Sequence, residues 1–333
     1  MCRRTIAAVM GIVLIVGAVT GTAAQGQATQ RASIVLDWIP NSDHGGLYVA
    51  MRDGIFRRHG IDASAHVPSD TSAQIRLVAA GSADFGISYE TDLLAARAHG
   101  VPVQSVMCIM QHPLNTVMSL RSSGIGRPRQ LAGRSIGMAG SPSDVPLVSA
   151  MMAHDGSSIR RARMVNVGYN LLPALLARRV DAVIGVYWTW EAIQAQQRGF
   201  PVNIMRVERW GVPNYCELVL VAAERTIRTR PGYVRDVVHS MQEGYQLAES
   251  HPSLAWSALR TADATFGEAR NHQLLLRSLA LLSPVIRDAP TIGHQDAGQW
   301  QRYAAWLARN KLIDRTVNAD AAFTNQFLEV GIR

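Results

Sequence analysis

The sequence predicts an α/β protein with two lobes, and three observations support this. The same order of strand, helix and strand occurs twice, at residues 61–89 and again at residues 162–188. A stretch rich in Gly and Pro, residues 121–140, separates the two units, as connections between domains do. About 309 residues (333 − 24) remain after an expected N-terminal export signal, which is enough for two lobes rather than one core.

The first 24 residues are predicted to be a cleaved signal peptide. Arg3 and Arg4 precede the apolar run TIAAVMGIVLIVGAV, and Thr22 and Ala24 supply small side chains at the −3 and −1 positions of a cleavage site. A retained membrane anchor is the alternative. No Cys lies directly after the apolar run, so a lipoprotein anchor is not expected. We therefore expect a periplasmic protein that is cleaved near Ala24.

Charge and cysteine content argue against several classes of protein. The formal net charge is +8, and it falls to about +6 (8 − 2) without Arg3 and Arg4. The basic residues are scattered, with no run of five like charges and no interleaved aromatic residues, so nucleic-acid binding is not expected. Cys108 and Cys216 remain after cleavage. They could form one disulfide, and no C-x-x-C metal motif is present.

The elements of the first unit follow from its periodicity. IDASAHVP at residues 61–68 alternates as a strand does, and TSAQIRLVAAG at residues 71–81 has helical spacing. ADFGISY at residues 83–89 has the composition of a short buried strand. Because a crossover between parallel strands is right-handed, the carboxyl ends of both strands should lie at one edge of a sheet.

The second unit repeats this order. Residues 162–168 read as a strand, residues 170–179 as a helix, and residues 180–188 as a buried strand. In both units an Asp beside an Ala follows the helix: Ala83 and Asp84 in the first unit, and Asp181 and Ala182 in the second. Aromatic residues stand at the end of the last strand in both. Each lobe should therefore present a polar and aromatic rim at the carboxyl end of its strands.

Two extended segments are predicted to connect the lobes. HPLNTVMSL at residues 112–120 leaves the first lobe, and YCELVLVAAE at residues 215–224 returns the chain to it. From Arg230 onward the pattern is mostly helical, and the helix in residues 296–310 begins with a plausible Asp cap. We assign residues 1–24 to the signal peptide, 31–119 and 224–333 to lobe 1, and 120–223 to lobe 2.

The chain contains few patterns that are typical of enzymes. G-x-S-x-G, H-E-x-x-H and the Walker-type loop are absent, and the ten His residues do not pair at metal-ligand spacing. GSADFGIS at residues 81–88 lacks the complete G-x-G-x-x-G fingerprint, so a turn before a strand explains it better than a dinucleotide site. We expect no catalytic residues, no metal and no cofactor.

Three clusters of aromatic and polar residues indicate a small-molecule site instead. The first contains Trp38, Asn41 and His44, in the turn after an apolar strand. The second contains Tyr89 and Glu90, at the end of ADFGISY. A buried structural role for Trp38 is the alternative, because an indole often serves the core.

The third cluster is VYWTWEA, which contains Tyr187, Trp188, Trp190 and Glu191. Successive side chains of a strand point to opposite faces, so these rings cannot all enter one core, and some must face a cleft. A carboxylate beside apolar rings is costly unless it has a partner such as a ligand amino group. A solvated Glu191 in the first turn of a helix is the alternative.

Several residues are weaker candidates. Ser141 precedes a helix N-terminus, where free N–H groups can meet an acceptor, whereas Ser143 or Asp144 can be read as ordinary helix caps. Gln111 and Asn115 lie where the chain leaves the first lobe, so they could line the cleft floor or act in a hinge. The complete set of weaker candidates is Ser88, Glu90, Gln111, Asn115, Ser141 and Tyr215.

Together these stretches resemble the periplasmic binding proteins of ABC importers in the thiamine-pyrimidine precursor family, which also includes the fungal pyrimidine-precursor synthase. The matching stretches are LDWIPNSDHGGLYVA with DGIFRRHGID, GSADFGISYETDLLAARAHGVPV, VYWTWEA, and a tail W-x-x-x-A-x-W-L that ends in FTNQFLEV. The resemblance covers nearly all of the mature chain. It implies a two-lobed, type II Venus-flytrap fold with two crossover strands. It also implies that the protein is a monomer and that its partner is a membrane ABC permease with its ATPase.

The resemblance also implies a flat heteroaromatic ligand, typically an aminopyrimidine, held between aromatic rings and read by a carboxylate. Trp38, Tyr187, Trp188 and Glu191 match those positions. On this basis the turn after LDW is expected to face VYWTWE across a cleft, as one half of an aromatic clamp.

Three rival readings rank below this one. The synthase branch uses a Lys and a His where this chain has Ser88 and Asp92, and the only lysine, Lys311, lies in the tail, so a cofactor Schiff base and an enzyme are not expected. Riboflavin or another flat ring system is the second choice, because Tyr89 and Trp190 would suit a wider ligand. A sulfonate is third, since the cleft segments contain no Arg.

Overall fold

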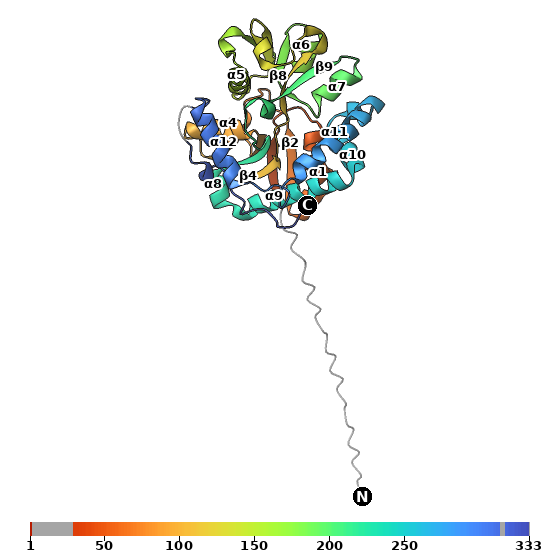
Figure 1. Cartoon of the computed structure of the whole chain (residues 1–333). Helices are drawn as coiled ribbons and strands as arrows, with labels where there is room; N and C mark the ends of the chain where they lie inside the picture. Colours follow the sequence, from red (N-terminus) through yellow and green to blue (C-terminus); the bar gives the residue numbers. More distant parts are fainter. Residues whose placement is uncertain (2–28, 314–316, 333) are drawn as a thin grey trace.

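The computed structural model describes residue 1, residues 29–313 and residues 317–332 (Figure 1). The predicted signal peptide, with Cys2 and the cleavage position near Ala24, lies outside these residues except for Met1. Within the described ranges, no helix combines the length and the apolar character needed to cross a bilayer. The chain forms two α/β lobes, each built on its own sheet, which confirms the predicted fold class.

The sheet of the first lobe has five strands. Along the sheet their order is β2 (Ile61–His66), β1 (Gln30–Val35), β3 (Phe85–Ser88), β10 (Leu218–Ala223) and β4 (Val103–Met110). The β1 strand is parallel to both β2 and β3, whereas β10 is antiparallel to both of its neighbours. The predicted unit of strand, helix and strand is therefore confirmed as β2, α3 and β3.

The sheet of the second lobe repeats this arrangement. Its order is β7 (Arg163–Asn166), β6 (Ser135–Met138), β8 (Ala182–Tyr187), β5 (Asn115–Leu120) and β9 (Val202–Arg206). The β6 strand is parallel to β7 and β8, and β5 is antiparallel to β8 and β9. The chain enters the second sheet from the first lobe by β5, and it returns to the first sheet by β10. These two antiparallel strands are the two crossover strands.

The crossings lie earlier in the chain than the expected lobe boundaries. The chain passes from β4 to β5 through residues 111–114 and returns from β9 to β10 through residues 207–217. β5 thus belongs to the sheet of the second lobe and β10 to that of the first. The expected boundaries at residues 119/120 and 223/224 had instead assigned nearly all of β5 to lobe 1 and β10 to lobe 2. An apolar linker and a buried strand have the same residue pattern, so periodicity does not separate them.

Helices cover both sheets, and the predicted helical C-terminal part is present (Figure 1). The side chain of Asp296 accepts a hydrogen bond from the amide of Gln299 at 2.6 Å, which confirms Asp296 as the predicted N-terminal cap of the helix in this region. The α-helices are α1 (Gly45–Arg52), α2 (Ile55–Arg58), α3 (Gln74–Ala79), α4 (Glu90–Ala98), α5 (Asp144–His154), α6 (Leu171–Leu176), α7 (Glu191–Gln197), α8 (Glu224–Thr229), α9 (Pro231–Ser250), α10 (Pro252–Ala262), α11 (Ala269–Arg287) and α12 (Ala297–Arg309). The short 3-10 helices include η1 (Ser42–His44) and η6 (Ala264–Gly267).

Helix α1 crosses α9 at two glycines. A Cβ atom on Gly46 would lie 2.3 Å from the ring of Tyr245, and one on Gly244 would lie 2.3 Å from the carbonyl oxygen of Gly46. Real Cβ atoms do not approach other atoms so closely, so both positions need glycine for the helices to pack. This contact fixes α1 and therefore the polar turn that precedes it.

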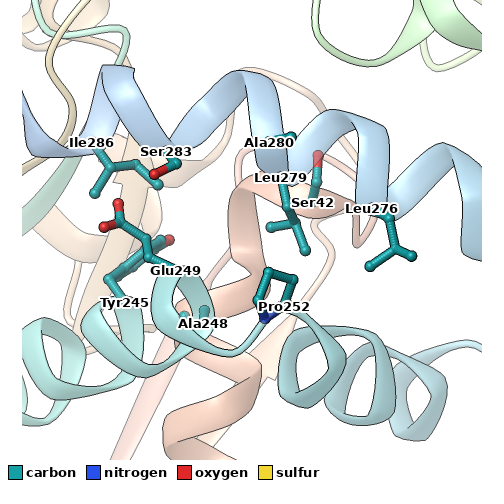
Figure 2. A pocket seen from close by; sticks show the side chains of 11 residues that line it. Ser42, Tyr245, Ala248, Glu249, Pro252, Leu276, Leu279, Ala280, Ser283 and Ile286 are labelled. Atoms are coloured by element: carbon teal, nitrogen blue, oxygen red, sulfur yellow. The ribbon is translucent and has the colours of Figure 1, made fainter.

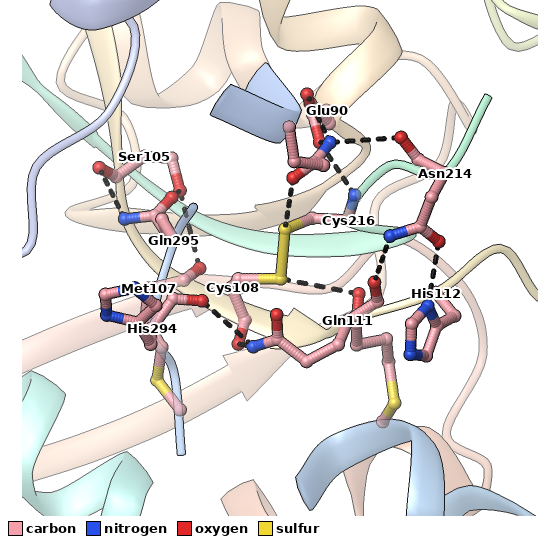
Figure 3. Close-up of a disulfide and its surroundings, with 12 residues drawn as sticks. Glu90, Ser105, Met107, Cys108, Gln111, His112, Asn214, Cys216, His294 and Gln295 are labelled. Atoms are coloured by element: carbon pink, nitrogen blue, oxygen red, sulfur yellow. Dashed lines mark hydrogen bonds between the residues drawn. A yellow bond between two sulfur atoms is a disulfide. The ribbon is translucent and has the colours of Figure 1, made fainter. Parts of the chain in front are cut away.

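A disulfide joins Cys108 in β4 to Cys216 immediately before β10 (Figure 3). Their Cα atoms are 5.9 Å apart, and 108 positions separate them in the sequence. All five strands of the second sheet, residues 115–206, lie between these two cysteines. The bridge therefore ties together the two chain segments through which the second lobe is connected, and it answers the question of pairing that the sequence left open.

Candidate functional site

A small cavity lies where the two lobes meet, and both sheets contribute to its walls. Its volume is about 20 Å³. This is room for about one water molecule, so the lobes are closed around it. The lining residues are Trp38, Thr71 and Tyr89 from the first lobe and Asn115, Ala139, Ser141, Ser143, Asp144, Gly185 and Tyr187 from the second.

Hydrogen bonds join the lobes beside this cavity. Each bond runs from a side-chain hydroxyl of one lobe to an oxygen of the other, so each must break when the lobes separate. The bonds are Thr71 Oγ1 to the Ala139 carbonyl at 2.8 Å, Ser141 Oγ to Asp92 Oδ2 at 2.7 Å, and Tyr169 Oη to the Pro68 carbonyl at 2.7 Å.

The turn that follows β1 is folded by its own polar side chains. Asn41 Oδ1 accepts from the amide of Asp43 at 2.7 Å, and His44 Nδ1 accepts from the amide of Asn41 at 3.2 Å. Because Nδ1 accepts, Nε2 of His44 carries the proton and donates to Asp37 Oδ1 at 2.9 Å. Asn41 and His44 are buried, and they shape this turn rather than the cavity wall, where sequence analysis had expected them.

The indole of Trp38 reaches the other lobe. Its ring centroid lies 4.7 Å from that of Tyr169, with the planes inclined by 53°. Tyr169 follows β7, in the segment that leads to α6. Sequence analysis missed this ring, although an aromatic residue after the strand ARMVNVG repeats the pattern seen after the other strands.

Tyr187 ends β8 and lines the cavity from the second lobe, whereas Trp38 lines it from the first. Its hydroxyl donates to Glu217 Oε1 at 3.4 Å, a long bond. Tyr89, at the end of the corresponding strand of the first lobe, also lines the cavity, and its hydroxyl donates to Asp37 Oδ2 at 3.2 Å. The ends of β3 and β8 thus bring two phenols together.

The other two rings of VYWTWEA lie elsewhere. The guanidinium of Arg206 lies 4.2 Å from the ring centroid of Trp188, whose Nε1 donates to the Pro113 carbonyl at 3.3 Å. Trp190 is buried, with its ring 6.2 Å from that of Phe266 in the first lobe. Neither ring lines the cavity, because β8 ends at Tyr187 and residues 188–190 form a turn that leads into α7.

Glu217 is a buried carboxyl group that sequence analysis did not select. Its Oε2 accepts from the amides of Leu114 and Asn115 at 2.8 and 3.1 Å and from the hydroxyl of Tyr215 at 3.0 Å. Tyr215, a weaker candidate, therefore holds Glu217 and does not line the cavity. Burial raises the pKa of Glu217 to about 7, and these hydrogen bonds offset part of that rise. The signal in the sequence was an acidic residue directly before an apolar strand.

Glu191 begins α7 directly after the aromatic segment. It is 8% exposed, so the solvated alternative is wrong. Its Oε2 accepts from the amide of Tyr187 at 2.8 Å, which fixes the backbone at the end of β8. Burial, and to a lesser extent the charge of Asp37, raises the pKa of Glu191 to about 7. In this closed arrangement Glu191 lies behind the cavity wall rather than on it.

Asp144 is the carboxyl group on the cavity wall. Its Oδ2 accepts from the amides of Gly140 and Ser141 at 2.9 and 3.0 Å, which closes the turn before α5. Burial raises the pKa of Asp144 to about 7 and that of Asp92, which accepts from Ser141, to about 6. Interpreting Asp144 only as a helix cap overlooked its place in the cavity, whereas Ser141 lies there as expected.

Besides Tyr215, three weaker candidates lie away from the cavity. Glu90 accepts from Gln299 Nε2 at 2.9 Å beside the disulfide, and burial raises its pKa to about 8. Gln111 Nε2 donates to the carbonyl of His294 at 3.0 Å in the same region (Figure 3). Ser88 is buried at the end of β3. Asn115 alone of the candidates near the first crossing lines the cavity.

The surroundings of the cavity are acidic. Among the residues that the structure describes, no Arg or Lys lines it. Both carboxyl oxygens of Asp43 are buried without a hydrogen-bond partner, and burial, followed by the charges of Asp37 and Glu191, raises its pKa well above the ordinary value. A site with these properties favours a ligand that donates hydrogen bonds or carries positive charge, and it disfavours an anion.

The raised pKa values predict that stability falls as pH rises. Glu217 and Glu191 move from 4.5 to about 7, and Glu90 moves from 4.5 to about 8. The folded state therefore binds more protons than the unfolded state between about pH 4.5 and 8, so the free energy of unfolding decreases across that window and levels off above it. We expect a higher melting temperature at pH 5 than at pH 8.

Glu217→Gln is the variant that isolates one of these groups. Its amide oxygen can replace Oε2 as the acceptor for the Leu114 and Asn115 amides. We expect the variant to gain roughly 1–3 kcal/mol over the wild type at pH 8 and almost nothing at pH 5. Urea unfolding at both pH values measures this, and an equal effect at both would contradict the assignment.

The architecture of two lobes, two crossover strands and a cavity between the carboxyl ends of the strands defines the class: this is the fold of the periplasmic solute-binding proteins. The alkanesulfonate-binding protein from Xanthomonas axonopodis pv. citri has this fold, with a TM-score of 0.69, 17% sequence identity, and coverage of 88% of this chain and 98% of that chain. The chain belongs to the family described as NMT1/THI5 like, whose model matches residues 41–255.

Two relatives of known name illustrate the range of this similarity. The formylaminopyrimidine-binding protein of Halalkalibacterium halodurans is 28% identical over 323 residues, which cover 97% of this chain and 98% of the relative. The 4-amino-5-hydroxymethyl-2-methylpyrimidine phosphate synthase of Legionella pneumophila is 22% identical over 301 residues, which cover 90% of this chain and 92% of the relative. The relatives thus include both a binding protein and an enzyme.

Proposed function

We propose that the protein is the extracytoplasmic solute-binding component of an ABC importer and that its ligand is an aminopyrimidine precursor of thiamine. The observation that carries this proposal is the cavity between the lobes, in which Trp38 and Tyr187 come from opposite lobes and Asp144 is the wall's carboxyl group. The match over nearly the whole length of the formylaminopyrimidine-binding protein supports it.

The chemistry of this cavity suits an aminopyrimidine. Both faces of the flat ring can pack against aromatic side chains, at roughly 0.5–1.5 kcal/mol per pair beyond the burial of area. The exocyclic amine needs an acceptor, and Asp144 is the carboxyl group on the cavity wall for this role. Glu191 does not line the closed cavity, so it would accept from the amine only if opening of the lobes exposes it. A protonated ring nitrogen next to the amine would allow a charge-assisted pair with either carboxylate.

The lobes must separate to admit such a ligand, because the closed cavity holds only about one water molecule. Opening would break the hydrogen bonds between the lobes, and closure over the ligand would remake them or replace them with ligand contacts. The closed form would then be the one that the membrane permease recognises, as in other hinge closures around ligands. We propose that the protein acts in this cycle as a monomer.

The proposal includes a periplasmic location and no catalysis. The buried disulfide between Cys108 and Cys216 suits an oxidising compartment. The synthase reading needs a lysine in the cleft, and the only lysine of the chain, Lys311, lies just after α12, far along the chain from the residues of the cavity.

The other two ligand classes fit the geometry less well. Riboflavin would use a wider aromatic clamp, yet Trp190 packs near Phe266 instead of lining the cavity. A sulfonate would meet Asp144 and, among the described lining residues, no Arg or Lys. The similarity to the alkanesulfonate-binding protein therefore indicates a shared fold and does not indicate a shared ligand.

The test is calorimetric titration of the mature protein with formylaminopyrimidine, 4-amino-5-hydroxymethyl-2-methylpyrimidine, riboflavin and an alkanesulfonate. We expect saturable binding of one or both pyrimidines at micromolar or lower concentration and none of the other two. Riboflavin or sulfonate binding without pyrimidine binding would overturn the ligand class. Asp144→Asn and Glu191→Gln, measured in parallel, identify which carboxylate reads the amine.

A further inference from the structure

A second and larger pocket lies within the first lobe, away from the cavity between the lobes. Its volume is about 340 Å³, which is within the range of small-molecule pockets. Helices α9 and α11 form opposite walls, and the beginning of α10 together with η1 and α1 completes them (Figure 2). Most of the lining is apolar, and it includes Ala248, Pro252, Leu276, Leu279, Ala280 and Ile286.

One carboxyl group stands in this apolar lining. Glu249, on α9, is directed between α9 and α11, toward Ser283 and Ile286 (Figure 2). Its side chain is 6% exposed, and Oε1 has no hydrogen-bond partner. Oε2 lies 3.6 Å from Nε of Arg287, whose side chain is 57% exposed and therefore interacts weakly through solvent.

The other polar atoms of the pocket are mostly engaged. The hydroxyl of Ser42 lies 2.6 Å from that of Ser278, and the hydroxyl of Tyr245 donates to the Asp43 carbonyl at 2.6 Å. A buried carboxylate oxygen without a donor is costly, and an occupant that supplies a donor lowers that cost. The unpaired oxygen of Glu249 is thus the group to which an occupant of the pocket would donate.

We propose that this pocket is a second binding site, for a small organic cation that joins a primary ammonium group to an apolar body about the size of a phenyl ring. The ammonium group donates to Glu249 Oε1, and the apolar body lies against Leu276 and Leu279. A buried carboxylate with a hydrogen-bonded ammonium partner is the charge-assisted arrangement that offsets desolvation.

The experiment uses 2-phenylethylammonium chloride as the probe, titrated calorimetrically into the mature wild-type protein. We expect saturable binding in the micromolar to low millimolar range. The neutral isostere 2-phenylethanol and the anion phenylacetate should bind at least about tenfold more weakly, because neither supplies a charged donor to the carboxylate. Equal binding of 2-phenylethanol, or no saturation at about 10 mM probe, would overturn the proposal.

Two variants on the same helix make the test specific. Glu249→Gln should weaken binding of the probe at least about tenfold. Glu243→Gln is the matched control, since Glu243 lies on α9 but forms its ion pair with Arg58 outside the pocket, so it should leave binding unchanged. The role of Glu249 would be contradicted if both variants kept the affinity of the wild type for the probe, or if both lost it to the same extent. Melting temperatures, which Glu249→Gln should not lower, show that both variants are folded.

Two further variants distinguish this site from the cavity between the lobes. Trp38→Ala should leave binding of 2-phenylethylammonium unchanged, because Trp38 does not line this pocket. Leu276→Ala should weaken it severalfold through lost apolar contact. If Trp38→Ala abolished binding while Glu249→Gln did not, the probe would be binding between the lobes and the proposal would be wrong.

Discussion

Replacing Trp38 with alanine is expected to weaken aminopyrimidine binding by about 100-fold, which is about 2.8 kcal/mol. The indole lines the cavity and lies 4.7 Å from Tyr169 of the other lobe, so its loss removes one wall of the clamp and one contact of the closed form. Buried aromatic residues at the centre of a contact surface often contribute this much. Calorimetric titration with 4-amino-5-hydroxymethyl-2-methylpyrimidine measures the loss.

Trp188→Ala is the matched control for this prediction. Trp188 is partly buried, as Trp38 is, and follows the strand β8 as Trp38 follows β1, but it stacks with Arg206 and does not line the cavity. We expect its replacement to change affinity by less than about threefold, because it removes no wall of the site. Similar losses in both variants, with unchanged melting temperatures, would show that the cavity is not the binding site.

Removing the disulfide is expected to lower the free energy of unfolding by about 2–5 kcal/mol. Cys108 and Cys216 are 108 positions apart, and the loop that they close contains the whole sheet of the second lobe. Without the bridge the unfolded chain gains the freedom of this long loop, whereas the folded sheets keep their hydrogen bonds. Urea unfolding of the Cys108→Ala/Cys216→Ala double variant measures the change.

Reduction provides an independent control for the same prediction. Wild-type protein unfolded in the presence of dithiothreitol should approach the double variant, and dithiothreitol should not change the double variant itself. A double variant as stable as the oxidised wild type would mean that the bridge adds nothing to stability. Because Cys216 also donates its amide to Glu90 at 2.7 Å, alanine keeps that contact and isolates the effect of the bridge.

Much of the fold was predictable because local patterns report burial. The alternating residues 61–68, the helical spacing of residues 71–81 and the apolar run at residues 83–89 appear as β2, α3 and β3. The second unit appears as β7, α6 and β8. The lobe boundaries were harder to predict, because a strand that crosses between lobes is as apolar and extended as one that stays within its lobe.

Within the site, composition indicated the region but not the inward-facing residues. Trp38, Tyr89 and Tyr187, which were selected from rims at strand ends, line the cavity. Two weaker candidates, Asn115 at the first crossing and Ser141 before a helix N-terminus, line it as well. Other lining residues, such as Thr71 and Gly185, carry no chemical signal in a sequence. Asn41 and His44 look like ligand-binding groups in a sequence, yet their partners are neighbours in the same turn.

By itself the sequence determined the two α/β units, the rims at the ends of their strands, the scarcity of catalytic patterns and the one pair of cysteines outside the predicted signal peptide. Each of these depends on residue type and on spacing along the chain, which tertiary contacts do not alter. Only the tertiary structure decided that Tyr187 rather than Trp188 or Trp190 lines the cavity, that Asp144 lies on its wall, and that Oε1 of Glu249 has no hydrogen-bond partner in a second pocket. The direction of a side chain and the partners of a buried carboxylate depend on segments far apart in the chain, and their packing exists only in the folded protein.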